Sequence, residues 1–156
     1  MSIPSRPKDF ENLEFESIDE KWNEYELQNG TKVRGRILVT RFFKDPRNPD
    51  PNMYSLSSKN IFVVDAPVLQ RNDPSPPLTL DEIKNPKGTP VEIVNSNERW
   101  NKFRILKTGL VLKVKMVVSD ATRLDGKYDA DGMPQYIFRS APMILPDQGA
   151  NTNVRT

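Results

Sequence analysis

The feature that most constrains the fold is a short aromatic motif that occurs twice. The stretches EKWNEY (20–25) and ERWNKF (98–103) contain the only two tryptophans of the chain, and each tryptophan is followed by Asn, a charged residue and an aromatic residue. With one extra residue in the second copy, Gly30 and Gly109 also match. A third match aligns NIFVVDAPVL (60–69) with YIFRSAPMIL (136–145). The repeat predicts an internal duplication with a period of about 78 residues, which is too long for a solenoid unit.

Each copy has the pattern of β-structure. Residues 31–43 and 110–122 are rich in Val, Ile, Leu and Thr that alternate with charged residues. QNGT and KTGL place a glycine where a tight hairpin needs a positive φ. Segment 17–22 fits either a strand or a short helix, because Ser17 and Glu20 form a capping-box pattern.

We therefore expect a mainly β protein of two tandem copies of a small barrel-like or sandwich-like module, related by a pseudo-two-fold axis. An OB-like or SH3-like barrel is compatible with this pattern. The expected organisation is an N-terminal arm (1–12), a first β-module (13–69), a proline-rich linker (70–90), a second β-module (91–145) and a flexible C-terminal tail (146–156). Within the linker, Thr79 and Glu82 predict one helical turn with a capping box.

Composition excludes several classes of function. The chain has no Cys and no His, so it cannot form a disulfide, a thiolate nucleophile or a Ser-His-Asp triad by itself. No phosphate-binding or dinucleotide-binding glycine motif occurs, and DGKYDADG (125–132) lacks the ligand spacing of an EF-hand and predicts a polar turn instead. We expect no enzyme activity, catalytic residue, cofactor or metal site. No apolar run has the length of a membrane span, so a cytoplasmic protein without membrane contact is expected.

The first hairpin separates an apolar face from a charged face. A three-residue loop at Asn29–Thr31 predicts that Leu27 lies opposite Val33, while Glu26 lies opposite Arg34 on the other face. The second copy keeps the apolar face, but its charged face becomes entirely basic at Lys102, Arg104, Lys113 and Lys115. Like charges on facing strands are unfavourable, so these four side chains either splay apart in solvent or bind an anion.

An acidic partner for this face occurs near the N-terminus. The residues of this acidic counter-surface are Asp9, Glu11, Glu14, Glu16, Asp19 and Glu20. They could meet the basic face within one chain or between subunits, and the second arrangement would give rings or filaments. The leading hypothesis is thus a non-enzymatic structural or binding protein that self-associates, as a homo-oligomer or larger assembly, with the acidic arm and first module against the basic second module.

The alternative hypothesis is a single-stranded nucleic-acid-binding module. The four basic side chains would contact phosphates, and Phe42 or Phe43 in RFFK (41–44) would stack on a base. Because adjacent residues of a strand point to opposite faces, at least one of these phenylalanines is expected to lie in the core. Trp22 and Trp100 are interpreted as equivalent core anchors, with ligand stacking as the other interpretation.

Overall fold

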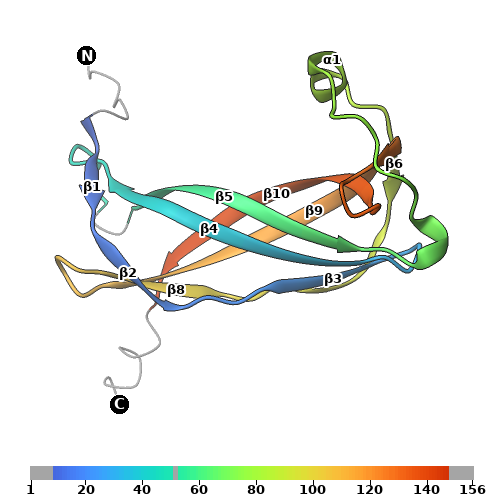
Figure 1. Ribbon diagram of the computed structural model, residues 1–156. Helices are drawn as coiled ribbons and strands as arrows, with labels where there is room; N and C mark the ends of the chain where they lie inside the picture. The colour runs from blue at the N-terminus through green and yellow to red at the C-terminus, as the bar shows by residue number, and fades with distance from the viewer. Residues whose placement is uncertain (1–8, 51–52, 148–156) are drawn as a thin grey trace.

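A computed structural model describes residues 9–50 and 53–147 of the chain and confirms the mainly β fold class (Figure 1). In chain order the elements are β1 (Glu11–Leu13), β2 (Phe15–Asp19), β3 (Asn23–Leu27), β4 (Lys32–Lys44), β5 (Ser55–Asp65), the 3-10 turn η2 (Val68–Gln70), α1 (Leu80–Lys84), β6 (Gly88–Val91), β7 (Ile93–Asn97), β8 (Asn101–Ile105), β9 (Val111–Tyr128) and β10 (Pro134–Pro146). These strands form two antiparallel sheets.

Every strand pairing in one sheet has an equivalent in the other. In the first sheet, β4 pairs with β5 along one edge, and with β3 and β1 at opposite ends of its other edge. In the second sheet, β9 pairs in the same way with β10, β8 and β6. The order of strands β1 to β5 is therefore repeated by β6 to β10. This equivalence is compatible with a duplicated module.

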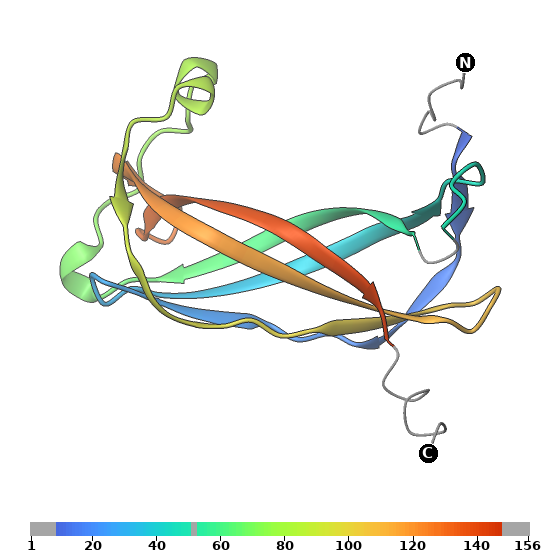
Figure 2. The same cartoon turned by 180° about the vertical axis from the view of Figure 1, so that it is seen from behind.

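The two halves of the chain exchange one strand each. Strand β2 pairs with β8 of the second half, and β7 pairs with β3 of the first half. Consequently neither sheet is built from one half alone. The ribbons β4–β5 and β9–β10 cross each other above a base formed by β2, β3 and β8, as the views from the front and from behind both show (Figures 1 and 2).

The repeated motif lies where the chain crosses between the sheets. The backbone N–H of Lys21 donates to Oδ1 of Asn101 at 2.6 Å, and the backbone N–H of Arg99 donates to Oδ1 of Asn23 at 2.8 Å. Asn23 also donates through Nδ2 to the carbonyl of Met116 at 2.9 Å. Asn23 and Asn101 are 3% and 1% exposed, so these bonds are shielded from water. The motif thus supplies a reciprocal pair of hydrogen bonds between the two crossing segments.

The hydrophobic core is divided into two clusters that both contain residues from the two sheets. The larger cluster comprises Leu13, Ile37, Phe42, Phe103, Ile105, Leu112, Val114 and Met116. The smaller cluster comprises Tyr25, Leu27, Val33 and Ala121. Ala121 of β9 occupies the position equivalent to Phe42 of β4, which explains why the second cluster is smaller. Because both clusters bridge the halves, the burial of either cluster requires the whole chain.

The hairpin register differs from the prediction by two residues. Tyr25 pairs with Val33, and in the second half Lys102 pairs with Lys113. The loop has three residues, as predicted, but it consists of residues 28–30: the N–H of Leu27 donates to the carbonyl of Thr31 at 2.8 Å, and Gly30 has a φ of 83°. Glycine takes the left-handed last position of such a loop. A shift of two leaves every side chain on its predicted face.

The third sequence match does not join equivalent positions. Phe62 of β5 pairs with Gly35, whereas Phe138 of β10 pairs with Ala121, near the other end of the equivalent ribbon. Instead, the two rings stack on each other with centroids 4.4 Å apart. The duplication is therefore supported by the two hairpins and their pairings, not by this match.

Local predictions in the connecting segments had mixed outcomes. The capping box of α1 is confirmed, since Thr79 Oγ1 accepts from the N–H of Glu82 and the Glu82 carboxylate accepts from the N–H of Thr79. Segment 17–22 contains the end of strand β2 and no helix. The polar turn predicted at 125–132 is confined to residues after Tyr128, because β9 continues to that residue.

The predicted ends of the chain are only partly described. Residues 11–12 of the predicted arm belong to β1, and residues 88–90 of the predicted linker belong to β6. The remainder of the arm at residues 1–8 and most of the predicted tail, residues 148–156, lie outside the described residues.

Substitution of either crossing asparagine is expected to destabilise the fold. Asn23→Ala and Asn101→Ala each remove a buried side-chain amide that accepts a partly buried backbone N–H, which should cost about 1–3 kcal/mol in the free energy of unfolding. Urea denaturation measures this loss. Asn12→Ala is the matched control, because Asn12 is exposed on β1 and should change stability by less than about 0.5 kcal/mol. Equal effects of the three substitutions would contradict the assigned role.

Candidate binding surfaces

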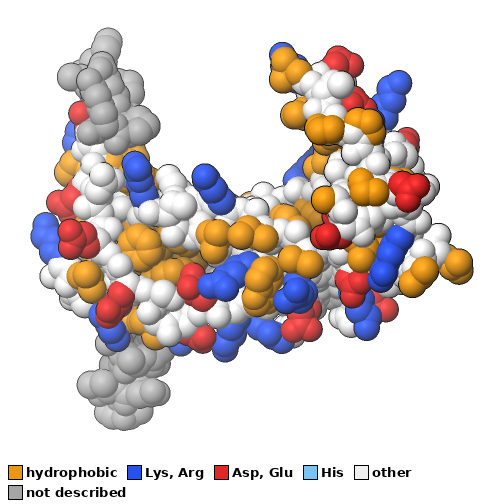
Figure 3. Space-filling view, viewed as in Figure 1, with side chains coloured by type: hydrophobic (Ala, Val, Ile, Leu, Met, Phe, Trp, Pro, Cys, Tyr) orange, Lys and Arg blue, Asp and Glu red, His pale blue; other side chains and the backbone are white. Residues whose placement is uncertain are grey.

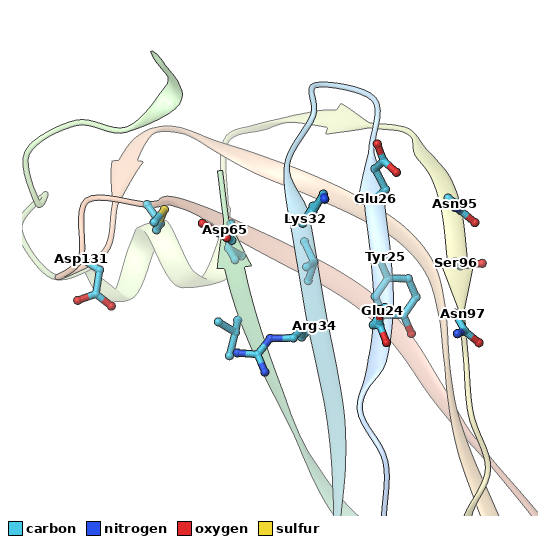
Figure 4. A pocket seen from close by; sticks show the side chains of 14 residues that line it. Glu24, Tyr25, Glu26, Lys32, Arg34, Asp65, Asn95, Ser96, Asn97 and Asp131 are labelled. Carbon is cyan, nitrogen blue, oxygen red and sulfur yellow. The ribbon is translucent and has the colours of Figure 1, made fainter. Parts of the chain in front are cut away.

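A groove lies on the outer face of the first sheet (Figure 4). Its volume is about 720 Å³. Strands β3, β4, β5 and β7 form its floor, and the turn between β9 and β10 contributes Asp131 and Met133. Four carboxylates and two cations line it: Glu24, Glu26, Asp65, Asp131, Lys32 and Arg34. We call this feature the acidic groove.

Two of the groove carboxylates are neutralised within the chain. Glu24 accepts from Arg99 at 2.9 Å, and Asp65 lies 3.4 Å from Arg71. Glu26 and Asp131 form no ion pair among the described residues, and both are exposed. Lys32 and Arg34 line the same groove and balance these two carboxylates in total charge. Glu26 and Asp131 are nevertheless carboxylates without an ion pair, which cations of a partner could bind.

The outer face of the second sheet is basic. The Nζ atoms of Lys113 and Lys115 lie 4.7 Å and 4.6 Å from the centroid of the Trp100 ring, and Lys102 is the direct cross-strand partner of Lys113. We call Trp100, Lys102, Lys113 and Lys115 the tryptophan–lysine face. Lys102 pairs with Asp147 at 3.2 Å, but neither Lys113 nor Lys115 has a carboxylate partner among the described residues. The fourth predicted cation, Arg104, forms an ion pair with Glu16 at 2.8 Å.

The first half contains the same arrangement in a neutralised form. Arg34 and Arg36 lie 5.0 Å and 5.8 Å from the Trp22 centroid, which matches the two lysines above Trp100. Here, however, Arg36 forms an ion pair with Glu20 at 3.0 Å, and the cross-strand partner of Arg34 is Glu24. The first face therefore has internal counter-charges that the second face lacks.

The counter-charge is missing because the equivalent glutamate points inward. Glu98 corresponds to Glu20, but its Oε2 accepts from the hydroxyl of Tyr25 at 2.8 Å and from the N–H of Val118 at 2.7 Å. Burial and the hydrogen bond to Glu98 raise the pKa of Tyr25 above its usual range, so the hydroxyl remains protonated and donates. The Glu98 carboxylate thus accepts hydrogen bonds where the chain crosses between the sheets, and it does not face Lys115 as Glu20 faces Arg36.

Both outer faces end in exposed apolar side chains on an edge strand. Ile61 and Val63 of β5 lie beside Arg36 and Arg34, whereas Met143 and Leu145 of β10 lie beside Lys115 and Lys113. Met143 and Leu145 are 43% and 44% exposed. Among the described residues, β5 and β10 each pair with one strand only. Figure 3 shows hydrophobic side chains between Lys and Arg side chains on the front face.

Most of the predicted acidic counter-surface is already paired within the chain. The pairs are Asp9–Arg47, Glu11–Lys107, Glu16–Arg104, Asp19–Lys21 and Glu20–Arg36. Only Glu14 of that set has no ion pair among the described residues. The strand exchange accounts for Glu16–Arg104, because it places β2 directly beside β8. The N-terminal segment therefore offers a partner few carboxylates that are without an ion pair, whereas the acidic groove has two, Glu26 and Asp131, among the described residues.

The aromatic residues singled out from the sequence have different environments. Phe42 is 0% exposed and packs edge-on against Phe15 and Phe103, so at least one of the two phenylalanines is a core residue, as predicted. Its burial prevents it from stacking on a base. Phe43 is half-buried, and its ring lies edge-on to Phe10.

The two tryptophans are half-buried and belong to neither core cluster, so the interpretation as core anchors is wrong. Alternation along the strand turns the asparagine of each motif inward and the tryptophan outward. This parity was available from the sequence. The hydrogen-bond partners of the asparagines could not be predicted from the sequence, because they depend on long-range strand pairings. The same is true of the residues that β7 and the β9–β10 turn add to the groove.

Comparison with known proteins gives no family for this chain. It matches no protein-family model, no curated protein and no solved structure. Within residues 9–50 and 53–147, no group of three or more acidic side chains is placed to hold a metal ion. In the same part of the chain, no helix is both long and apolar enough to cross a membrane.

Truncation of the paired phenylalanines should separate the core residue from the surface residue. Phe42→Ala is expected to lower the free energy of unfolding by about 3–5 kcal/mol, because it opens a cavity beside the rings of Phe15 and Phe103. Phe43→Ala is the matched control and should cost clearly less, since its ring already contacts solvent. Chemical denaturation of both variants provides the comparison. A larger loss for Phe43→Ala would contradict the placement of these side chains.

Proposed function

We propose that the protein is a non-enzymatic binding or structural protein that acts by head-to-tail self-association. The acidic groove of one copy binds the tryptophan–lysine face of the next, together with the adjacent apolar residues of β10. The single observation that carries this proposal is the presence, on two different surfaces of one chain, of carboxylates without an ion pair at Glu26 and Asp131 and ammonium groups without an ion pair at Lys113 and Lys115 among the described residues.

The two surfaces are also complementary in their apolar parts. Val63 lines the acidic groove, and Met143 and Leu145 are exposed beside the two lysines. Contact between these side chains would remove apolar area from water, which contributes about 25 cal/mol per Å². The charges would mainly fix the orientation of the two copies and accelerate their encounter. Apolar contact supports affinity, and charge supports specificity.

The geometry of such an assembly follows from the use of two different surfaces. A contact between unlike surfaces leaves one groove and one tryptophan–lysine face open at the ends of every pair. Further copies can therefore add, and the product is a ring if the rotation between copies closes, or a filament if it does not.

Charge reversal provides a direct test of this interface. Glu26→Lys with Asp131→Lys makes the groove basic, and Lys113→Glu with Lys115→Glu makes the opposite face acidic. Each double variant alone should remain monomeric, because its two surfaces then carry the same charge. An equimolar mixture of the two double variants should associate again, since both types of contact in the mixture are complementary. Sedimentation velocity at low and high salt measures the mass in each case.

The quadruple variant, with all four substitutions in one chain, is the internal control. Its groove is basic and its opposite face is acidic, so it should self-associate as the unmodified chain does. An unmodified chain that remains monomeric at every protein and salt concentration would refute the proposal. Association of either double variant alone would assign the contact to another surface.

A further inference from the structure

We infer that Lys113 and Lys115, held over Trp100, also bind the phosphate groups of single-stranded nucleic acid, independently of nucleotide sequence. This inference concerns the same lysines as the proposed self-association but does not depend on it. The two lysines lie over one tryptophan ring, and Lys102 faces Lys113 across the strand pair. Three ammonium groups are therefore gathered on one face, with Asp147 as the only carboxylate paired to them among the described residues.

The ring of Trp100 fixes the two ammonium groups in position. A cation over an indole ring is stabilised by about 0.5–1 kcal/mol at an exposed site, so each lysine gains from its position over the ring. The two like charges nevertheless repel each other, and both side chains are half-buried, which weakens screening by water. A bound anion would remove this repulsion without any change in the positions of the lysines. The face is accordingly organised for an anion before one binds.

The equivalent face of the first half shows that the hairpin does not need this charge. Arg34 and Arg36 occupy the same positions over Trp22, but Glu20 and Glu24 accompany them. In the second half Lys102 replaces Glu24, and Glu98 is directed into the crossing. The same fold is thus built with and without an uncompensated basic face. This difference points to a ligand and not to a structural requirement.

The shape of the face indicates an extended polyanion. Lys113 and Lys115 follow each other on one side of β9, and Lys102 faces Lys113 from β8, so the cations are spread over the outer face of a sheet. Lysine binds phosphate as a point charge, without the paired geometry that arginine gives to a carboxylate. Because the ammonium groups cover Trp100 and Phe42 is buried, neither of these two rings is free to stack on a base. Binding should consequently depend on phosphate contacts and hence on salt.

Trp100 itself can report binding. In the variant Trp22→Phe, Trp100 is the only tryptophan of the chain, and its fluorescence should respond when phosphates bind to the two ammonium groups over its ring. The probe is an oligothymidylate at low salt. With three ammonium groups engaged, the logarithm of the binding constant should fall with the logarithm of salt concentration with a slope of about −2. Anisotropy of a dye-labelled oligothymidylate on the unmodified chain gives the same affinity without the Trp22 substitution.

Lysine substitutions separate this site from the remainder of the surface. Lys113→Gln with Lys115→Gln should weaken binding at least about tenfold. Lys113→Arg with Lys115→Arg should retain most of the affinity. Arg34→Gln with Arg36→Gln is the matched control in the first half and should leave affinity unchanged. Circular dichroism confirms that each variant is folded.

The outcomes also distinguish this inference from the proposed self-association. No fluorescence or anisotropy change, or an equal loss in the first-half control, would overturn the inference. Poly-glutamate that binds as tightly as the oligothymidylate would overturn it as well, by assigning the face to acidic protein. Copies that associate without binding the oligonucleotide would leave the proposed function intact. Binding by a chain that stays monomeric would support the inference alone.

Discussion

The fold depends on the hydrogen bonds that Asn23 and Asn101 make where the chain crosses between the sheets. Each side-chain oxygen accepts a backbone N–H from the opposite crossing segment, and both asparagines are buried. A buried asparagine side chain without its hydrogen-bond partner is costly, so separation of the two crossing segments is unfavourable at both asparagines. This contact holds β2 against β8 and β7 against β3. The exchange of strands, the division of the core and the positions of both outer faces all follow from it.

The exchange also explains how a chain with a modest apolar content forms a stable core. Only 36% of its residues are hydrophobic, and a β-module of half this length would bury a small fraction of its surface. By sharing strands, the halves place Leu13 and Phe42 of one against Phe103 and Leu112 of the other in a single cluster. Some apolar residues that remain outside it, such as Leu145, lie on edge strands, and others, such as Leu69 and Leu80, lie in the segment between β5 and β6.

The sequence predicts the local features of this fold better than its long-range pairings. Alternation assigns each hairpin residue to the correct face, and the Thr79 capping box is found as predicted. The register was missed because a three-residue loop can begin at either of two neighbouring positions of QNGT, and the φ of Gly30 decides between them. The match of Phe62 with Phe138 was misleading because alternating apolar residues followed by Ala-Pro are common in edge strands. The sequence does not indicate the strand exchange. Because β2 and β7 are equivalent segments, each could pair within its own half or with the other half.

The inverted charge of the second hairpin is informative because the chain contains its own reference. In a domain with one such hairpin there would be no equivalent hairpin for comparison, and its basic residues could be explained simply as solvated side chains. Here the first hairpin has an equivalent tryptophan, two cations at equivalent positions and equivalent strand neighbours, yet Glu20 pairs with Arg36 and Glu24 lies opposite Arg34. Replacement of Glu24 by Lys102 and the inward direction of Glu98 therefore remove two counter-charges from a face that folds equally well with them. Repulsion between the lysines lowers stability without improving the packing, and a surface that retains such a cost is best explained by what binds to it.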